Sequence, residues 1–204
     1  MTKKYKISII IIIFLLFVIC TLGVIYFTRD DEKELVIEKK DEISNYNYTL
    51  KENDSSLKEE KFNELKEILE KAEIDDAKYA QVLAEIFVLD VYDLDSKLNK
   101  YDIGGVEFIF ENEKDKFKKI MQDTLYNSIE DDTLNNREQE LPKVTNVINE
   151  EILSEKFEYK GIVYPSWNVQ IKIDYKKDLG YDNNVLVTVI KEENKLYIVA
   201  ISPV

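Results

Sequence analysis

The chain contains no histidine and a single cysteine, Cys20. The missing histidine excludes Ser-His and Cys-His nucleophilic sites, histidine acid–base relays and histidine-containing zinc sites. A single cysteine excludes a disulfide within the chain, so a folded domain must depend on its core. The phosphate-binding patterns G-x-x-x-x-G-K-S/T and G-x-G-x-x-G are missing as well. Carboxylates and tyrosines are therefore the groups left to build a site.

Glycine is scarce, with five residues in 204, yet Gly104 and Gly105 stand side by side in "KYDIGGVEF". Paired glycines either cradle a phosphate or let the backbone turn where a side chain would clash. No Lys-Ser or Lys-Thr follows this pair, so a turn is favoured. The stretch "KKDLGYD" at 176–182 repeats the Asp-aliphatic-Gly pattern between two expected strands, as suits an Asx-type turn.

Residues 7–27, "ISIIIIIFLLFVICTLGVIYF", run for 21 residues without a charge. At about 1.5 Å rise per residue, a helix of this length crosses a bilayer core of about 30 Å, so we expect a transmembrane helix. The alternative is a cleaved secretory signal, but its apolar region covers only about 7–15 residues, and Thr21-Leu22-Gly23 is a poor cleavage site. The bulky Ile19 before Cys20 argues against lipidation.

The charges beside this run differ in sign, with lysines at 3, 4 and 6 before it and acids at 30, 31, 32 and 34 after it. The positive-inside rule predicts a cytoplasmic tail at 1–6, a single span and an extracellular C-terminal part. Only four of the 28 cations, and none of the 41 acids, precede residue 30, which leaves the exported part a net charge of −17. Nucleic acid is a poor partner for such a surface, whereas the lipid bilayer is contacted through Ile7 to Phe27.

After the span, residues 28–54 are charged and lack a sustained apolar period, which predicts a tether. An amphipathic helix is expected over 55–74, because Ser56-Leu57-Lys58-Glu59 matches a capping box. Its narrow apolar stripe contains Phe62, Leu65, Leu69 and Ala72. The stripe either packs on the domain or self-associates as a stalk, and its shortness favours packing.

Residues 75–204 predict an α+β domain, beginning with a helix that Asp75 or Asp76 caps and that runs to about Leu98. This helix is apolar on nearly every face, which is typical of a central helix, yet Asp90 falls in the middle of one apolar side. A short strand at Val106 to Phe110 follows the glycines. A third helix then begins near Asn112, with one face formed by Phe117, Ile120, Met121, Thr124 and Leu125.

In the last part of the chain, apolar residues recur at every second position. Trp167 to Tyr175 alternates apolar and polar residues, as in a half-buried antiparallel strand, and Val185–Ile190 and Leu196–Ile201 form a hairpin around "KEENK". Weaker strands are expected at 141–148 and 157–163. Helices followed by a meander predict helices packed on one face of a bent antiparallel sheet.

This order of elements, over roughly residues 75–202, resembles the nuclear-transport-factor-2-like (cystatin-like) cone. With one span in front, the chain also resembles bitopic scaffold subunits of type IV secretion and conjugation systems. The stretch "YAQVLAEIFVLDVYDLDSKLNKYDIGGVEF", together with "QELP" and "YKKDLGY", resembles the sequences of small anchored Gram-positive proteins of unknown function. The resemblance implies a cone fold and an envelope setting, and it transfers no catalytic residue.

Two functions follow from these observations. The first is a noncatalytic, membrane-anchored extracytoplasmic interaction or scaffold module with protein partners or self-association, part of a secretion, conjugation or envelope assembly. The alternative is an enzyme or small-ligand binder whose cone pocket is centred on Asp90, since a desolvated carboxylate can act as a base.

Asp90 also has a structural interpretation, in which its carboxylate accepts hydrogen bonds from the N–H groups of Gly104 and Gly105. This interpretation is favoured, because no second polar group at fixed spacing accompanies Asp90. Glu85, Asp90, Asp93 and Asp95 suggest a hard-cation site, but Glu85 and Asp95 face away from Asp90 on the expected helix, and no EF-hand spacing is present. We therefore assign no catalytic residue, cofactor or metal ligand.

Overall fold

The computed structural model describes residues 38–204. The expected tail at 1–6 and membrane helix at 7–27 lie outside the described residues. Within 38–204, no helix is both long enough and apolar enough to cross a bilayer.

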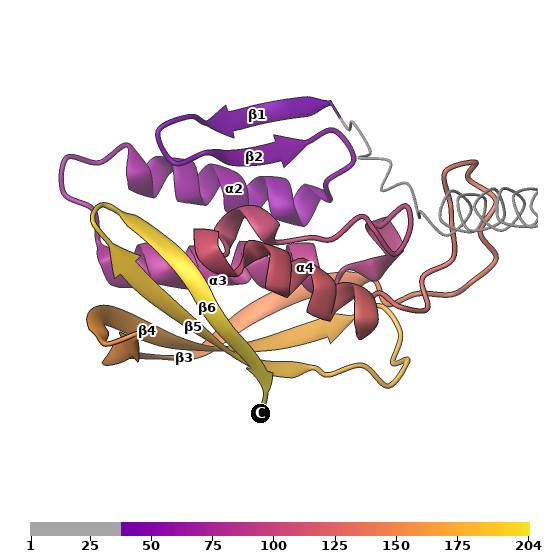
Figure 1. Ribbon diagram of the computed structural model, residues 1–204. Helices are drawn as coiled ribbons and strands as arrows, with labels where there is room; N and C mark the ends of the chain where they lie inside the picture. Colours follow the sequence, from indigo (N-terminus) through magenta and orange to yellow (C-terminus); the bar gives the residue numbers. More distant parts are fainter. Residues whose placement is uncertain (1–37) are drawn as a thin grey trace, which may run out of the picture. The chain divides into compact units, whose positions relative to one another are not determined.

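A four-stranded antiparallel sheet and two long helices form the domain (Figure 1). The strands β3 (Val144–Tyr159), β4 (Ile162–Tyr175), β5 (Asn184–Glu192) and β6 (Lys195–Pro203) pair in sequence order as a meander. Helices α2 (Ser56–Leu69) and α3 (Asp76–Tyr92) lie on one face of this sheet. The expected α+β class, with helices and an antiparallel sheet, is confirmed.

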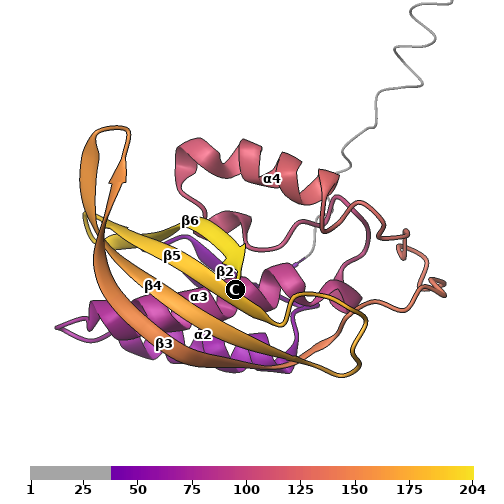
Figure 2. The ribbon, with the colours of Figure 1, turned by 90° about the horizontal axis from the view of Figure 1, so that it is seen from below.

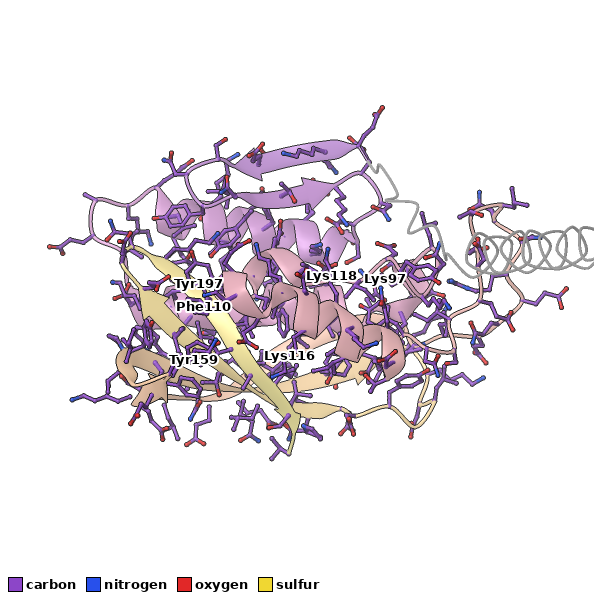
Figure 3. All side chains as sticks on the ribbon, in the orientation of Figure 1. Lys97, Phe110, Lys116, Lys118, Tyr159 and Tyr197 are labelled. Atoms are coloured by element: carbon purple, nitrogen blue, oxygen red, sulfur yellow. The ribbon has the colours of Figure 1, made fainter. Side chains whose placement is uncertain are left out.

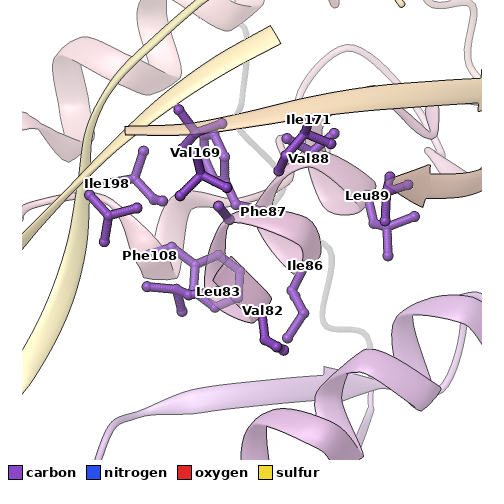
Figure 4. Packing of buried hydrophobic residues seen from close by; sticks show 14 of the residues in the cluster. Val82, Leu83, Ile86, Phe87, Val88, Leu89, Phe108, Val169, Ile171 and Ile198 are labelled. Carbon is purple, nitrogen blue, oxygen red and sulfur yellow. The ribbon is translucent and has the colours of Figure 1, made fainter. Parts of the chain in front are cut away.

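Helix α3 is buried on both sides because it lies between the sheet and α2. Figure 4 shows Phe87 and Val88 directed toward Val169 and Ile171 of β4, whereas Ile86 points away from the sheet. All of these side chains are buried in one hydrophobic cluster. The near absence of a polar face on this helix, noted in the sequence, thus reflects contacts all around it.

The tether predicted at 28–54 is wrong for its second half, because β1 (Lys39–Ile43) and β2 (Tyr48–Lys51) form an antiparallel hairpin. Tyr48 is fully buried and its hydroxyl lies 2.7 Å from that of Tyr79, while it donates to the carbonyl of Leu196 at 3.1 Å. Only Tyr48 and Leu50 are buried in β2. Two buried residues among many charged ones are too few to produce an apolar period in the sequence.

The two helices begin near their predicted positions. Ser55, rather than Ser56, caps α2, since its Oγ accepts from the Lys58 N–H at 3.2 Å. Phe62, Leu65 and Ile68 are buried, so packing of this helix on the domain is confirmed. The Asp75 cap of α3 is confirmed as well.

Helix α3 ends at Tyr92 and not at Leu98, because the chain turns into a short 3₁₀ helix at Leu94–Ser96. The strand predicted at 106–110 is a 3₁₀ turn at Val106–Phe108, followed by a single parallel bridge between Ile109 and Ile198. Helix α4 (Lys114–Asp123) begins two residues after the expected Asn112.

The weak strands predicted at 141–148 and 157–163 were placed incorrectly. Strand β3 is continuous from Val144 to Tyr159, and the second predicted strand straddles the turn at Lys160 and Gly161. The polar stretch between the two predicted strands interrupts the apolar pattern, but an edge strand keeps polar residues in solvent without losing its ladder. The predicted strand at Trp167 to Tyr175 and the hairpin around "KEENK" are confirmed.

Candidate functional site

Asp90 lies in the last turns of α3 and is only 7% exposed. Its Oδ1 is 3.0 Å from Lys58 Nζ and 2.9 Å from Lys97 Nζ. Its Oδ2 accepts from the Gly105 N–H at 2.7 Å, which confirms one of the two predicted glycine contacts. The Gly104 N–H donates instead to the hydroxyl of Tyr126 at 3.2 Å. Both carboxylate oxygens of Asp90 therefore have partners.

The contacts of Asp90 extend into a wider network that we call the Asp90 cluster, formed by Asp54, Lys58, Asp90, Lys97 and Tyr126. Lys58 Nζ also lies 2.9 Å from Asp54 Oδ1. The Tyr126 hydroxyl donates to the Val91 carbonyl at 2.9 Å. The cluster thus joins α2, the end of α3, the glycine turn and the segment after α4.

The paired glycines are required by close backbone approach. A Cβ at Gly104 would lie 1.8 Å from the carbonyl oxygen of Asp90, a distance that no folded backbone tolerates. Gly105 has φ of +75°, and its Cβ would lie 2.7 Å from the ring of Phe87. The turn interpretation of "KYDIGGVEF" is therefore supported, and the acceptor it meets is Asp90.

Electrostatic interactions keep the side chains of Asp90 and Lys97 ionised. Burial by itself would raise the pKa of Asp90, but the charges of Lys58 and Lys97 outweigh it and hold that pKa well below its usual value. Burial would likewise lower the pKa of Lys97, and the negative charge of Asp90 raises it instead. A carboxylate held ionised and bonded on both oxygens is a poor proton acceptor.

The pocket that the alternative function requires at Asp90 is thus filled by charged and hydrogen-bonded neighbours. The other acids considered as metal ligands have separate partners. Glu85 pairs with Lys61 at 2.7 Å, Asp93 accepts from the Val144 N–H at 3.0 Å, and Asp95 lies 3.5 Å from Lys143. The geometry assigns the Asp90 cluster a structural role.

Glu107 stands beside the cluster and connects the glycine turn to the N-terminal hairpin. Its Oε2 accepts from the N–H of Thr49 at 3.0 Å and from the hydroxyl of Thr49 at 2.8 Å. Burial raises the pKa of Glu107 to about 7, although the Thr49 bonds act against it, and the negative charge of Asp90 adds to the rise. This carboxyl therefore titrates near neutral pH.

A second candidate site is an open hollow between α4 and β6, with a volume of about 200 Å³. Its walls are mainly apolar, with Phe87, Ile109, Phe117, Ile120 and Ile198 among them, and they also contain the charged Glu113 and Lys116. No residue of α4 is fully buried, and Ile120 is 46% exposed. The apolar face predicted for this helix is real, but it is only partly covered.

A neighbouring hollow of about 350 Å³ extends this site toward Tyr92 and Tyr181. Met121 and Ile201 line both hollows, and we call the two together the α4–β6 groove. Figure 2 shows α4 running beside β6, the last strand of the sheet.

A group of aromatic rings lies next to Glu113, one of the residues that line the hollow between α4 and β6. Phe110 meets Tyr159 edge to face at 5.6 Å and Tyr197 at 5.4 Å between ring centroids. The Tyr159 hydroxyl donates to Glu113, and Lys116, whose side chain is 73% exposed, lines the groove beside Glu113. Figure 3 shows Lys116 and Lys118 leaving α4 on different sides.

The sequence pattern predicts the apolar face of α4 but not the groove. Phe117, Ile120 and Met121 share this face, and such a face normally indicates contact with the core. That α4 stands off from β6 depends on tertiary packing, which no local pattern encodes.

Comparisons with known proteins give no relative: no family model, no curated protein and no solved structure matches this chain.

Proposed function

We propose that the protein is a membrane-anchored, noncatalytic interaction module whose α+β domain lies outside the cytoplasm and serves a secretion, conjugation or envelope assembly. The uncharged run at 7–27 and the opposite charges on its two sides support the anchor and the orientation. As a finer description of the fold, we propose the nuclear-transport-factor-2-like cone, which the packing of α3 on a four-stranded meander supports.

The observation that carries this proposal is the contrast between a filled charged cluster and an open apolar groove. Asp90 has no free oxygen with which to act on a substrate. The α4–β6 groove instead exposes apolar side chains beside an uncharged strand edge. Exposed apolar patches and open sheet edges are typical of surfaces that bind other proteins.

Photo-crosslinking in intact membranes tests the proposal. A benzophenone amino acid replaces Ile120 in the groove or, as a matched control, Leu153 on β3, because the two side chains are 46% and 47% exposed. We expect a discrete protein adduct from position 120 that position 153 does not give. A domain that stays without adducts at both positions in cells would contradict an interaction module.

Labelling of an introduced cysteine tests the orientation separately. With Cys20 replaced by serine, a cysteine in place of Leu134, which is 80% exposed, becomes the single thiol of the chain. We expect a membrane-impermeant maleimide to label it in intact cells. Labelling only after cell lysis would place the domain on the cytoplasmic side.

A further inference from the structure

The second hollow of the α4–β6 groove lies where the end of α4 meets the loop between β4 and β5, and we call it the Tyr92 hollow. Its volume is about 350 Å³. Met121, Leu125 and Ile201 form an apolar wall, and all three are only partly buried. A cavity of about 150 Å³ is enough to hold a benzene molecule in a protein interior. The Tyr92 hollow therefore has room for one long side chain.

Tyr92, the last residue of α3, brings a hydroxyl without a partner to this hollow. The residue is only 8% exposed, yet its hydroxyl forms no hydrogen bond within residues 38–204. Sealed polar atoms without a partner occur in that part of the chain at Glu85, Tyr101 and Asn149, and not at Tyr92. The Tyr92 hydroxyl is therefore open to the hollow that the residue lines. Since buried phenol hydroxyls usually have a hydrogen-bond partner, a ligand in the hollow can supply it.

Asp182, in the loop between β4 and β5, adds a carboxylate to the lining of the hollow. The residue is exposed, and its carboxylate forms no ion pair or hydrogen bond with the part of the chain that the structure describes. Its main-chain carbonyl accepts from the Tyr175 hydroxyl at 2.9 Å, which holds this part of the loop in place. Burial raises the pKa of Tyr92 to about 12, and the negative charge of Asp182 adds to the rise. The carboxylate and the Tyr92 hydroxyl thus lie near each other.

The charge of the Tyr92 hollow is negative. Asp182 is the single charged residue among the described residues that line it, and Lys176 and Lys177, at the start of the same loop, are not part of the lining. The adjoining hollow adds Glu113 and Lys116, whose charges cancel. The whole chain has a net charge of −13, which also attracts cations. A cationic group is therefore the complementary ligand for this hollow.

We propose that the Tyr92 hollow binds a lysine side chain of a partner protein, with its ammonium group at Asp182 and Tyr92 and its methylene chain along the apolar wall. An ammonium group has three donors that can rotate toward two separate acceptors, whereas the rigid fork of arginine suits one bidentate acceptor. The four methylenes of lysine cover apolar surface while the charged end stays near water. This inference deepens the interaction function proposed above and rests on it.

NMR of the full chain in a nonionic detergent tests this proposal. The chain contains two methionines, so methyl labelling gives two signals, which Met121→Leu assigns. Met121 lines the hollow, and Met1, in the predicted cytoplasmic tail, is the internal reference. With the peptide acetyl-Gly-Lys-Gly-amide as the probe, we expect a saturable shift of the Met121 signal in the millimolar range. The same peptide with its lysine acetylated on Nζ should bind at least about fivefold more weakly.

Variants of the two polar groups test the site. Asp182→Asn should weaken the lysine peptide by at least about fivefold, because it removes the charge of the hollow. Asp178→Asn is the matched control, since it makes the same charge change in the same loop outside the lining. Its asparagine keeps the oxygen that accepts from the Gly180 N–H at 2.9 Å. This control should change the affinity by less than about twofold. Tyr92→Phe keeps the ring and should cost about twofold to fivefold.

An unchanged Met121 signal in each variant without peptide shows that the hollow is intact, so a weaker shift then reports binding. Equal weakening by Asp182→Asn and Asp178→Asn would mean a general attraction of cations and would overturn the site.

The lysine assignment has its own contradicting outcomes. Lack of a saturable Met121 shift, or equal binding of the acetylated peptide, would overturn it. Butylamine that shifts Met121 while the lysine peptide does not would identify a free amine as the ligand, and tighter binding of an arginine peptide would also contradict the proposal. Adducts from position 120 in membranes, together with failure of the lysine peptide, would remove this inference and leave the interaction function standing.

Discussion

The Asp90 cluster and the α4–β6 groove reverse the usual relation between polarity and exposure. Charged groups are buried in the first, where Asp90, Lys58 and Lys97 are 7%, 3% and 6% exposed. Apolar groups face solvent in the second, where Ile120 is 46% exposed. In the cluster each charge has a partner at hydrogen-bonding distance, whereas in the groove the apolar side chains lack a full set of neighbours. Completeness of contacts, rather than the type of residue, distinguishes a structural feature from a binding surface.

Asp90→Ala should have the largest effect, because it leaves two buried lysines without their shared carboxylate. We expect the free energy of unfolding to fall by about 3–5 kcal/mol, measured by urea denaturation of the full chain in detergent. Asp95→Ala is the control, since the Asp95 side chain is 43% exposed and should change stability by less than about 0.5 kcal/mol. A loss below about 1 kcal/mol at Asp90 would mean that the cluster is not structural.

Glu107→Gln tests whether the carboxyl group beside the Asp90 cluster makes the unfolding free energy depend on pH. The pKa of Glu107 is about 7 in the folded protein and about 4.3 in an unfolded chain, so the folded state holds its proton more tightly. Glu107 therefore costs stability as pH rises from about 4.5 to 7, by about 1–3 kcal/mol.

Glutamine keeps an oxygen that accepts from Thr49 and has no proton to lose. The variant should be more stable than the native protein at pH 8 and nearly equal to it at pH 4.5, in urea titrations across this range. An unchanged pH dependence between 4.5 and 7 would show that the Glu107 carboxyl has an ordinary pKa. Asp90 does not confuse the measurement, because its lowered pKa places its loss of stability below pH 4.

Tyr48→Phe tests whether the N-terminal hairpin is part of the buried core, like the Asp90 cluster. Loss of the hydroxyl removes the contacts with Tyr79 and Leu196 and should cost about 0.5–1.5 kcal/mol in thermal or urea unfolding. Tyr46→Phe is the control, since Tyr46 stacks on Tyr48 through its ring, at 5.9 Å between centroids. If residues 39–51 were a loose tether, both variants would unfold as the native protein does.

Ile120→Glu should have the smallest effect on folding. A half-exposed side chain on a helix without buried residues contributes little to the core, so we expect the unfolding free energy to change by less than about 0.5 kcal/mol. A large drop in stability, similar to that of Asp90→Ala, would show that Ile120 belongs to the core and that the groove is not a separate surface.

Much of the architecture could be predicted from local patterns. The alternation from Trp167 to Tyr175 and the all-round apolar character of α3 both reflect contacts with large neighbouring surfaces, so their periods are strong. The pairing of Gly105 with Asp90 could be predicted because glycine is rare in this chain and a lone carboxylate on an apolar helix face needs donors.

The lysines of the cluster could not be predicted. Lys58 lies on an amphipathic helix among many charges, where a lysine usually indicates solvent, and Lys97 follows the end of α3. Their long side chains reach Asp90 only after α2 and the glycine turn are in place. The hairpin at 39–51 was missed for a related reason, because two buried residues, Tyr48 and Leu50, are too few to produce a period.

The convergence of three segments on Asp90 also bears on how the domain opens. Lys58 belongs to α2, Lys97 follows α3 and Gly105 lies in the turn beyond it, yet all three bind one carboxylate. None of these segments detaches alone without leaving a buried charge uncompensated, so partial openings are suppressed. Native-state hydrogen exchange should therefore show α2, the end of α3 and the glycine turn exchanging together, as one cooperative unit that opens only when most of the domain unfolds.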